Sequence, residues 1–398
     1  MKIAMIGSKG MPARSGGVER HVEAVATRLA KAGHEVLVYT RPWYAGKKLE
    51  IGNWKLVVAW RGVQLITLPS IVTKHCDAIS HTLMASLDVL RRDVDVVHYH
   101  GIGPSLLLWI PKLFSRATVV ATFHCQDYHH QKWNGFARLM LRAGEWMACT
   151  VADETIVVSR ELERYVWSAY QRHATYIPNG VTAVTRVSAR TLKRWNLTRG
   201  SYIVYIGRLV RHKGVHTLIE AYRGLIQNTK IQNLNANLPL LVIVGAGANT
   251  PEYEAELKRI AKGLPIRFVG EQTGEALAAL TQHARVLVHP SISEGMSLLL
   301  LEAMAAGTPV LASNIPENRE VLGRSGTSFV ADDVHDASRK LQWCLAHPKT
   351  MTRRARIATR ISREYNWDQV VADLTDRYVR MVWIKQARPV ELQGKPVR

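Results

Sequence analysis

The stretch RVLVHPSISEGMSLLLLEAMAAGTPVLAS, residues 285–313, contains a strand, a helix and a second strand in succession. Residues 285–291 are a short β-branched run that predicts a strand, and a Ser/Gly-rich turn follows it. Residues 298–307 predict a helix that ends at Gly307, and residues 308–313 predict the next strand. Because strands joined through helices form parallel sheets covered on both faces, the stretch predicts an α/β fold.

Two glutamates in this stretch, Glu294 and Glu302, have seven residues between them. Glu294 lies in the turn after the first strand, where doubly wound sheets bind ligands. Glu302 lies inside an apolar run, where a carboxylate without a partner costs free energy. Ionised carboxylates accept hydrogen bonds from sugar hydroxyls, including a ribose diol, whereas the helix amides near Ser297 suit a phosphate. The pair therefore predicts contacts with a sugar-bearing ligand.

The same alternation of strand-like and helix-like segments runs along most of the chain. Strands are predicted at 2–7, 35–40, 94–101, 117–124, 153–159 and 174–180, and again at 201–209, 238–247, 266–270, 285–291 and 308–313. The pattern weakens between residues 181 and 200, which predicts a domain boundary there. We therefore expect two doubly wound domains that face each other, with the ligand at the strand ends in the cleft between them.

We divide the chain into two predicted domains and a predicted C-terminal tail. Residues 1–183 are the predicted N-terminal, Rossmann-like domain, and residues 184–364 are the predicted C-terminal, Rossmann-like domain. Residues 365–398 are expected to form a helical tail that packs back toward the first domain. A chain of 398 residues is longer than one hydrophobic core usually grows, so its length also favours two domains.

Composition indicates a soluble, cytoplasmic protein. Hydrophobic residues make up 47% of the chain and charged residues 21%. No apolar run reaches the roughly 18 residues of a membrane-spanning helix, and MKIAMIG is expected to be a strand and not a signal peptide. Four cysteines occur at scattered spacings without a C-x-x-C motif, which favours reduced thiols over a disulfide framework or a zinc site.

The chain carries a formal net charge of +21 from 53 basic and 32 acidic side chains. Nucleic acid is disfavoured as a partner because no binding motif is present and the basic residues are spread along the chain. Residues 41–62 interleave tryptophans with lysines and arginines, and residues 351–363 form a basic helix. Such surfaces suit an anionic membrane, although ordinary solvated faces explain them equally well. Two interpretations therefore remain: peripheral association with the inner face of the membrane, and ordinary solvated surfaces.

Two further segments predict phosphate contacts at strand ends. Gly16 and Gly17 follow the first strand and open a helix, where free amides and close backbone approach suit an anion. The loop is neither G-x-G-x-x-G nor a Walker A motif, so a nicotinamide cofactor is not expected, and a plain βα turn is the alternative. Arg208 and Lys213 follow a strand of the second domain and suit a diphosphate, unless they are ordinary surface cations.

The motif EGMSLLLLEAMAAGTPVLAS, with its E-x7-E spacing, resembles the donor site of retaining family 4 glycosyltransferases of the GT-B fold. The blocks GGVERHV, His124, YIPNGV (176–181), GRLVRHKG (207–214) and VGAG (244–247) agree in order. The resemblance covers nearly the whole chain, and it implies that residues 1–183 are the acceptor-side domain and residues 184–364 the nucleotide-sugar donor domain. Residues 123–162 are further similar to a bacterial subset often labelled rhamnosyltransferase-like.

The resemblance implies roles for individual residues. Glu302 resembles the glutamate that binds the ribose, and Glu294 resembles the one that contacts the transferred sugar. Arg208 and Lys213 resemble the pair that binds the diphosphate. The resemblance places the backbone amides of Gly295, Met296, Ser297 and Leu298 near the sugar. It places Gly16 and Gly17 in the loop that lies over the phosphates. His124 resembles a histidine beside the donor sugar, where it binds a hydroxyl or steadies developing positive charge.

On the acceptor side, Asp127, His129 and Lys132 are candidates, and Asp127 is a possible base. Cys125 follows His124 where relatives often have a small residue, and we expect it to alter packing and not to act as a nucleophile. The DVD sequence at 93–95 precedes a predicted buried strand, so we assign it no metal. No metal or other cofactor is expected; the nucleotide-diphosphate-sugar is a substrate.

The predicted reaction is metal-independent transfer of a sugar, with retention, from a nucleotide-diphosphate-sugar to an acceptor hydroxyl. The acceptor is expected to be a saccharide or lipid-linked precursor of a bacterial surface polysaccharide, such as capsule, exopolysaccharide or lipopolysaccharide. A nucleotide-sugar 2-epimerase of the same fold is one alternative, and the E-x7-E block argues against it. A non-catalytic binding protein is the other, and the complete set of predicted site residues disfavours it.

Overall fold

The computed structural model describes residues 1–14, 16–45, 55–73, 76–129, 133–227, 238–247 and 250–387. The chain divides into two compact units. Unit 1 comprises Met1–Asn179 and the segment from Trp367 onward, and unit 2 comprises Gly180–Asn366. The chain therefore leaves unit 1 once and returns to it at the end. The predicted bounds at 183 and 365 lie within a few residues of these crossing points.

Unit 1 is built on an eight-stranded sheet in the order β3-β4-β2-β1-β5-β6-β7-β8. The strands are β1 (Lys2–Ile6), β2 (Glu35–Thr40), β3 (Leu56–Trp60), β4 (Val63–Thr67), β5 (Val96–His100), β6 (Thr118–Phe123), β7 (Glu154–Val157) and β8 (Thr175–Tyr176). All neighbours are parallel except β3 and β4. The predicted parallel sheet is confirmed, but the β3–β4 hairpin was missed, because the aromatic and basic residues of the segment that contains β3 indicated a surface.

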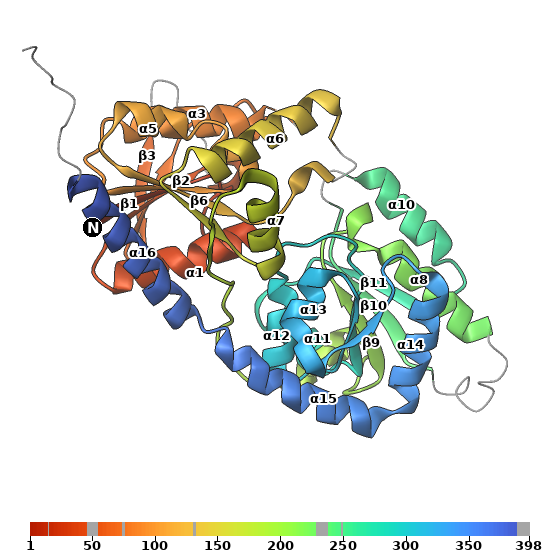
Figure 1. Ribbon diagram of the computed structural model, residues 1–398. Helices are drawn as coiled ribbons and strands as arrows, with labels where there is room; N and C mark the ends of the chain where they lie inside the picture. Colours follow the sequence, from red (N-terminus) through yellow and green to blue (C-terminus); the bar gives the residue numbers. More distant parts are fainter. Residues whose placement is uncertain are drawn as a thin grey trace, which may run out of the picture. The chain divides into compact units, whose positions relative to one another are not determined.

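Helices cover both faces of this sheet (Figure 1). One face carries α1 (Gly17–Lys31) and α16 (Trp367–Ala387), and the other carries α3 (Asp77–Val89), α5 (Trp109–Phe114) and α6 (Gly135–Thr150). Shorter or peripheral helices are α2 (Pro42–Ala45), α4 (Ile102–Ser105), η1 (Asp127–His129) and α7 (Arg160–Tyr170). The helix α1 packs on the sheet because Val22, Val25 and Leu29 recur at helical spacing and are fully buried.

Unit 2 is built on a six-stranded, fully parallel sheet in the order β11-β10-β9-β12-β13-β14. The strands are β9 (Tyr202–Ile206), β10 (Leu240–Val244), β11 (Ile266–Gly270), β12 (Val286–His289), β13 (Val310–Ser313) and β14 (Thr327–Phe329). This is the doubly wound order in which the winding reverses between the first and fourth strands, here β9 and β12. The three-residue β14 was not predicted, since so short a run carries no periodicity.

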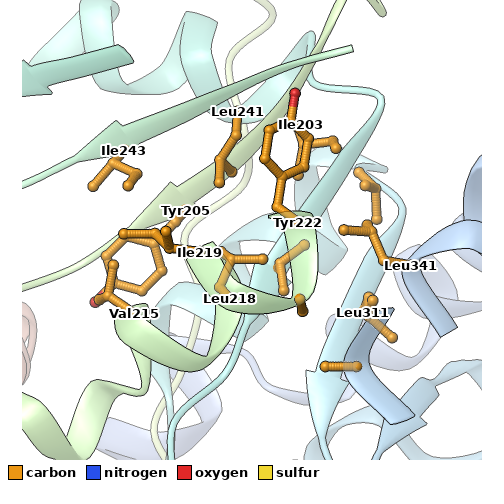
Figure 2. Close-up of a cluster of buried hydrophobic side chains, with 14 of the residues drawn as sticks. Ile203, Tyr205, Val215, Leu218, Ile219, Tyr222, Leu241, Ile243, Leu311 and Leu341 are labelled. Atoms are coloured by element: carbon orange, nitrogen blue, oxygen red, sulfur yellow. The ribbon is translucent and has the colours of Figure 1, made fainter. Parts of the chain in front are cut away.

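Helices also sandwich the sheet of unit 2 (Figure 1). They are α8 (Val215–Gln227), α10 (Pro251–Ile260), α11 (Gly274–Gln282), α12 (Leu298–Ala306), α13 (Pro316–Leu322), α14 (Val334–Ala346) and α15 (Pro348–Ile361). On one face, Ile203 and Leu241 of the strands pack against Leu218 and Tyr222 of α8, as Figure 2 shows, and all four are at most 2% exposed. This packing fixes β9, whose far end carries the predicted phosphate-binding residues.

The last described part of the chain, up to residue 387, contains two helices. The helix α15 ends at Ile361, a short 3-10 turn (Ser362–Glu364) follows, and α16 begins at Trp367. On unit 1, the Nζ of Lys385 in α16 donates to the carbonyl oxygen of Ala117, 2.6 Å away. In the part of the chain that the structure describes, no helix is both long and apolar enough to cross a membrane.

Candidate active site

In unit 2, the loops after β9 and β12 meet at the point where the winding of the sheet reverses. Gly214 has a φ of +65°, and a Cβ at this position would lie 2.0 Å from the carbonyl oxygen of Pro290. The backbone N–H of Ile292 donates to the carbonyl oxygen of His212 over 2.9 Å. Only glycine permits this close approach. This close approach brings the loop after β9, which carries the predicted phosphate-binding residues, against the loop after β12, which carries the predicted sugar-binding glutamate.

The ion pair between Lys213 and Glu294 is the direct result. The Nζ of Lys213 lies 2.5 Å from Oε1 of Glu294, and Nε2 of His289 lies 3.0 Å from the same oxygen. Burial alone would raise the pKa of Glu294, but the charge of Lys213 and the contact with His289 outweigh it. The pKa of Glu294 therefore lies well below its usual value, and this carboxylate is ionised in the folded protein.

Arg208 lies two residues after the end of β9, in the same loop as Lys213. Its carbonyl oxygen accepts a hydrogen bond of 3.0 Å from the hydroxyl of buried Tyr205, which fixes the backbone there. Among the residues that the structure describes, none forms a hydrogen bond or ion pair with the guanidinium of Arg208. Two cations and one carboxylate thus lie at the switch point, where open α/β sheets bind their ligands.

The helix α12 carries the second glutamate of the E-x7-E motif. Ser297 caps its N-terminus by accepting the N–H of Leu300 over 3.3 Å, and Gly307 ends the helix in a left-handed conformation. Glu302 is half-buried, and it shares its helix face with Leu299 and Ala306, while the other faces are buried. This placement explains how a carboxylate is tolerated in a leucine run. The preceding segment, Gly295, Met296, Ser297 and Leu298, is buried.

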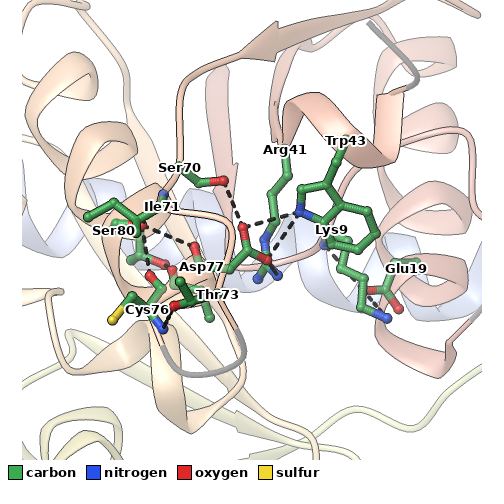
Figure 3. Close-up of polar contacts among 12 residues, drawn as sticks. Lys9, Glu19, Arg41, Trp43, Ser70, Ile71, Thr73, Cys76, Asp77 and Ser80 are labelled. Carbon is green, nitrogen blue, oxygen red and sulfur yellow. Dashed lines mark hydrogen bonds and ion pairs between the residues drawn. The ribbon is translucent and has the colours of Figure 1, made fainter. Parts of the chain in front are cut away.

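In unit 1, the glycine loop after β1 is held by acidic side chains. Gly16 has a φ of +99°, and a Cβ there would lie 1.9 Å from Oε2 of Glu19. The other oxygen of Glu19 accepts the backbone N–H of Lys9 over 3.2 Å, and Nζ of Lys9 lies 4.0 Å away (Figure 3). A Cβ on Gly17 would meet nothing within 4 Å. The fold therefore requires glycine at position 16, whereas position 17 has room for a larger side chain.

His124 follows β6 and belongs to a buried group of histidines. Its Nε2 lies 3.3 Å from Nδ1 of His100, which ends β5. His21, from α1, is 4.8 Å from His124 between ring centroids, and its Nδ1 lies 2.8 Å from Oδ1 of Asn179. Burial is the main cause that lowers the pKa of all three, to about 4 for His21. The three imidazoles are therefore neutral near pH 7.

The predicted acceptor residues fall in and after η1. The thiol of Cys125 lies 3.2 Å from Oδ1 of Asp127, so this cysteine contacts the candidate base. His129 is the last residue of η1, and its side chain lies outside the described part of the structure, as does the whole of Lys132. In the DVD segment, the carboxylate of Asp95 accepts the backbone N–H of Lys2 over 2.7 Å and so joins β1 to the turn before β5.

Part of the aromatic and basic segment at 41–62 forms internal contacts, as Figure 3 shows. Arg41 is 8% exposed, and its Nη1 lies 2.7 Å from Oδ2 of Asp77. The indole N–H of Trp43 and the hydroxyl of Ser70 donate to the same carboxylate. Arg41 is thus a buried structural cation and not part of a charged surface. Trp54, which was grouped with them in the sequence, lies outside the described residues.

Two family models match the chain in succession. Residues 15–184 match "Glycosyltransferase Family 4", and residues 191–361 match "Glycosyl transferases group 1". The two matches cover both units, and the second spans the E-x7-E motif. The chain is a family 4 glycosyltransferase. The family assigned by resemblance is confirmed; the rhamnosyltransferase-like subset stays a prediction.

Individual relatives agree with this assignment. The glycosyltransferase is 27% identical to glycogen synthase of Mycobacterium tuberculosis, over 95% of this chain and 94% of the relative. It is 28% identical to phosphatidyl-myo-inositol mannosyltransferase of Mycobacterium leprae, over 91% and 92% of the two chains. Sucrose-phosphate synthase of Thermosynechococcus elongatus has the same fold, with a TM-score of 0.78, 22% identity, and 96% and 99% of the chains covered. The GT-B fold is therefore confirmed.

Sequence reasoning missed four residues that the fold of the glycosyltransferase brings to these sites. They are His21, His100, Asn179 and His289. The sequence VVHYHG did contain a signal, because strand alternation places His98 and His100 on one face of β5. The contact between His21 and Asn179 joins positions 158 residues apart, and no local pattern indicates it.

Proposed function

We propose that this glycosyltransferase moves a sugar from a nucleotide-diphosphate-sugar to an acceptor hydroxyl with retention and without a metal ion. The ion pair of Lys213 and Glu294 at the switch point of unit 2, with Arg208 in the same loop as Lys213, carries the proposal. Cleavage of the donor places negative charge on the departing diphosphate. Preorganised cations stabilise such charge in place of a divalent ion.

The donor's parts are assigned to separate residues of unit 2. Arg208 and Lys213 bind the diphosphate, and the amide groups from Gly295 to Leu298 lie near the sugar. Glu294 is kept ionised by Lys213, so it accepts hydrogen bonds from sugar hydroxyls at neutral pH. Glu302, on the half-buried face of α12, accepts the ribose hydroxyls. When phosphate arrives, Lys213 shares its three N–H donors between Glu294 and the diphosphate.

Unit 1 contributes His124 and the acceptor side. We assign to His124 a hydrogen bond with the donor sugar, and its neutral state means that it adds no charge to the oxocarbenium-like centre. Gly16 and Gly17 contact the diphosphate through their backbone. The amide of nearby Lys9 already binds Glu19, so this loop offers the phosphate fewer free donors than a typical glycine-rich loop. Asp127, His129 and Lys132 serve the acceptor.

For the acceptor, we favour a lipid-linked or saccharide precursor of a surface polysaccharide at the membrane. A relative that is 28% identical carries the name phosphatidyl-myo-inositol mannosyltransferase, which supports a lipid acceptor. The helix α15 exposes Arg353, Arg356 and Arg360 at helical spacing, a basic stripe that suits anionic headgroups. Flotation with anionic vesicles across a salt series tests this; no binding at low salt contradicts it.

Donor binding is tested first with a panel of nucleotide-sugars, because a bound ligand raises thermal stability by mass action. For the stabilising donor, Glu302→Ala is expected to weaken nucleotide affinity by about 1–3 kcal/mol, since it loses two hydrogen bonds to ribose. The matched control is Glu252→Ala, an exposed glutamate of the same unit. Equal losses in both variants, or none in Glu302→Ala, would remove the assigned role.

Transfer itself is tested by following free nucleotide diphosphate and the anomeric configuration of the product. A transferase releases the diphosphate at full rate only when acceptor is present, and EDTA should not reduce this rate. An epimerase releases an altered sugar without acceptor, which would contradict the proposal. An inverted product would leave the transferase class intact and refute retention.

A further inference from the structure

Three histidines of unit 1 bring ring nitrogens together at the switch point of its sheet. Candidate ligand atoms of His21, His100 and His124 all lie within 4.8 Å of one another, and the residues are 1–8% exposed. They come from α1, from the end of β5 and from the residue after β6. The proposed reaction uses His124 alone, so the other two imidazoles have no role in it.

His21 is held in the tautomer of a metal ligand. Its Nδ1 lies 2.8 Å from Oδ1 of Asn179, and an amide oxygen only accepts hydrogen bonds, so Nδ1 carries the proton. Nε2 therefore keeps its lone pair. That nitrogen is buried, and no described residue donates to it. Metal-ligating histidines commonly donate their second ring N–H to an oxygen acceptor in this way.

His100 and His124 have the spacing of two nitrogen ligands on one ion. Their Nδ1 and Nε2 atoms are 3.3 Å apart. Two nitrogens bound at about 2.0–2.1 Å to a tetrahedral zinc ion are separated by about 3.3 Å. One of these two nitrogens carries the proton between them, and the other already presents its lone pair; a shift of that single proton to the other nitrogen of its own ring frees both lone pairs. His124 is the most exposed of the three, at 8%.

We propose that His21, His100 and His124 bind one divalent late-transition-metal ion, of the class of Zn²⁺, and that this ion inhibits glycosyl transfer. Three imidazole nitrogens select such ions over Mg²⁺ and Ca²⁺, which require oxygen ligands. Bound metal occupies a nitrogen of His124 and places a dication beside the donor sugar. The inhibition rests on the proposed function, whereas metal binding itself does not.

Binding is measured by calorimetric titration of Zn²⁺ into EDTA-treated, dialysed protein. One tight site is expected in the wild type, absent in His21→Gln and His124→Gln. It is retained in His335→Gln, the control at an exposed position of α14 in unit 2. Asn179→Leu should weaken it about 10–100-fold, because the second-shell acceptor is lost. A wild type without a tight site, or a site that survives both ligand substitutions, would overturn the proposal.

The wild type also gives a test that needs no variant to fold. Co²⁺ bound by three imidazoles and water in tetrahedral geometry gives intense visible absorption, and Zn²⁺ should abolish it; only weak, octahedral bands would contradict the site. Zinc should inhibit transfer in competition with the donor, and EDTA should restore activity. Tight zinc binding without transfer on any donor refutes the proposed function but not the site. Transfer that is insensitive to bound zinc refutes the inhibition.

Discussion

The Nζ of Lys213 lies 2.5 Å from Oε1 of Glu294, and these residues come from the two loops at which the winding of unit 2 reverses. Their side chains are 17% and 11% exposed. A pair this buried is worth little when intact, because desolvation offsets the attraction. Removal of one partner is costly, because the other charge is left without compensation. The site's electrostatics and the stability of unit 2 are therefore linked.

Lys213→Ala should lower the free energy of unfolding at pH 7 by up to about 3 kcal/mol. In this variant the charge of Lys213 no longer offsets the effect of burial, so the pKa of Glu294 rises. The folded variant then binds a proton at Glu294 more readily than the unfolded chain does. Part of the lost stability should return as the pH falls from 7 to 5. Urea titrations at both pH values measure this. The double variant Lys213→Met with Glu294→Gln is the control, and it should lose less than Lys213→Ala.

A Lys213→Ala protein as stable as the wild type at pH 7, with no change in its pH dependence, would contradict the burial of this pair. Loss of transfer in both the single and the double variant is expected regardless, because each lacks a phosphate-binding cation. Stability and activity therefore report on different properties of Lys213.

The two glycines before α1 should respond differently to alanine. Gly16→Ala places a Cβ against Glu19 at a φ that only glycine adopts readily, so it should cost about 1–3 kcal/mol of stability. Gly17→Ala should leave stability unchanged or slightly higher, because alanine favours the helix and the Cβ meets no neighbour. If Gly17 contacts the donor, KM for the donor rises in this stable variant. Thermal melts and donor titrations separate the two effects.

These glycines also show what sequence could predict. The run GSKGMPARSGG indicated a tight strand-to-helix loop, and the loop is there; the pattern did not show which glycine the backbone requires. That distinction depends on Glu19, whose carboxylate folds back onto the loop. The E-x7-E motif similarly placed Glu294 on a loop and Glu302 on a helix. The side-chain partners of such residues come from other strands, and local periodicity carries no information about them.

The β3–β4 hairpin and the histidine group show the same limit. Trp60 and the residues around it alternate in exposure along β3, but basic neighbours hid the strand in the sequence. His100 was visible at a strand end, yet its partner His21 lies on α1, and the two meet only because β1 and β5 are neighbours. Element types are local properties and were largely predictable. Contacts that build the site depend on strand order.

The helix α16 contacts His98, whose ring neighbours that of His100 in the histidine group. The hydroxyl of Tyr378 in α16 lies 2.5 Å from Nδ1 of His98, whose Nε2 lies 2.7 Å from Oγ1 of Thr122. Tyr378→Phe leaves a buried imidazole nitrogen without its partner and should lower the stability of unit 1 by about 1–3 kcal/mol. Val379→Ala, at a neighbouring exposed position, should change it by less than about 0.5 kcal/mol. Urea unfolding compares them, and equal effects would contradict a role for this hydrogen bond.

Unit 1 should begin to lose stability at pH values well above those at which carboxylates titrate. Burial is the main cause that lowers the histidine pKa values in the folded protein, to about 4 for His21 and His81 and about 3 for His98, with His100 and His124 also far below 6.5. Below about pH 6.5 the unfolded chain binds protons that the folded unit does not. Stability is therefore full above that pH and falls as the pH decreases toward 4.

Each of these histidines contributes a slope of up to about 1.4 kcal/mol per pH unit, so the total loss between pH 6.5 and 5 should amount to several kcal/mol. Urea midpoints at pH 7, 6 and 5 measure it. His81→Leu removes one titrating group that lies outside the proposed site, and should reduce the slope by that amount. The exposed His335→Gln should leave the slope unchanged. A midpoint that stays constant from pH 7 to 5 would mean that these imidazoles are not held neutral by burial.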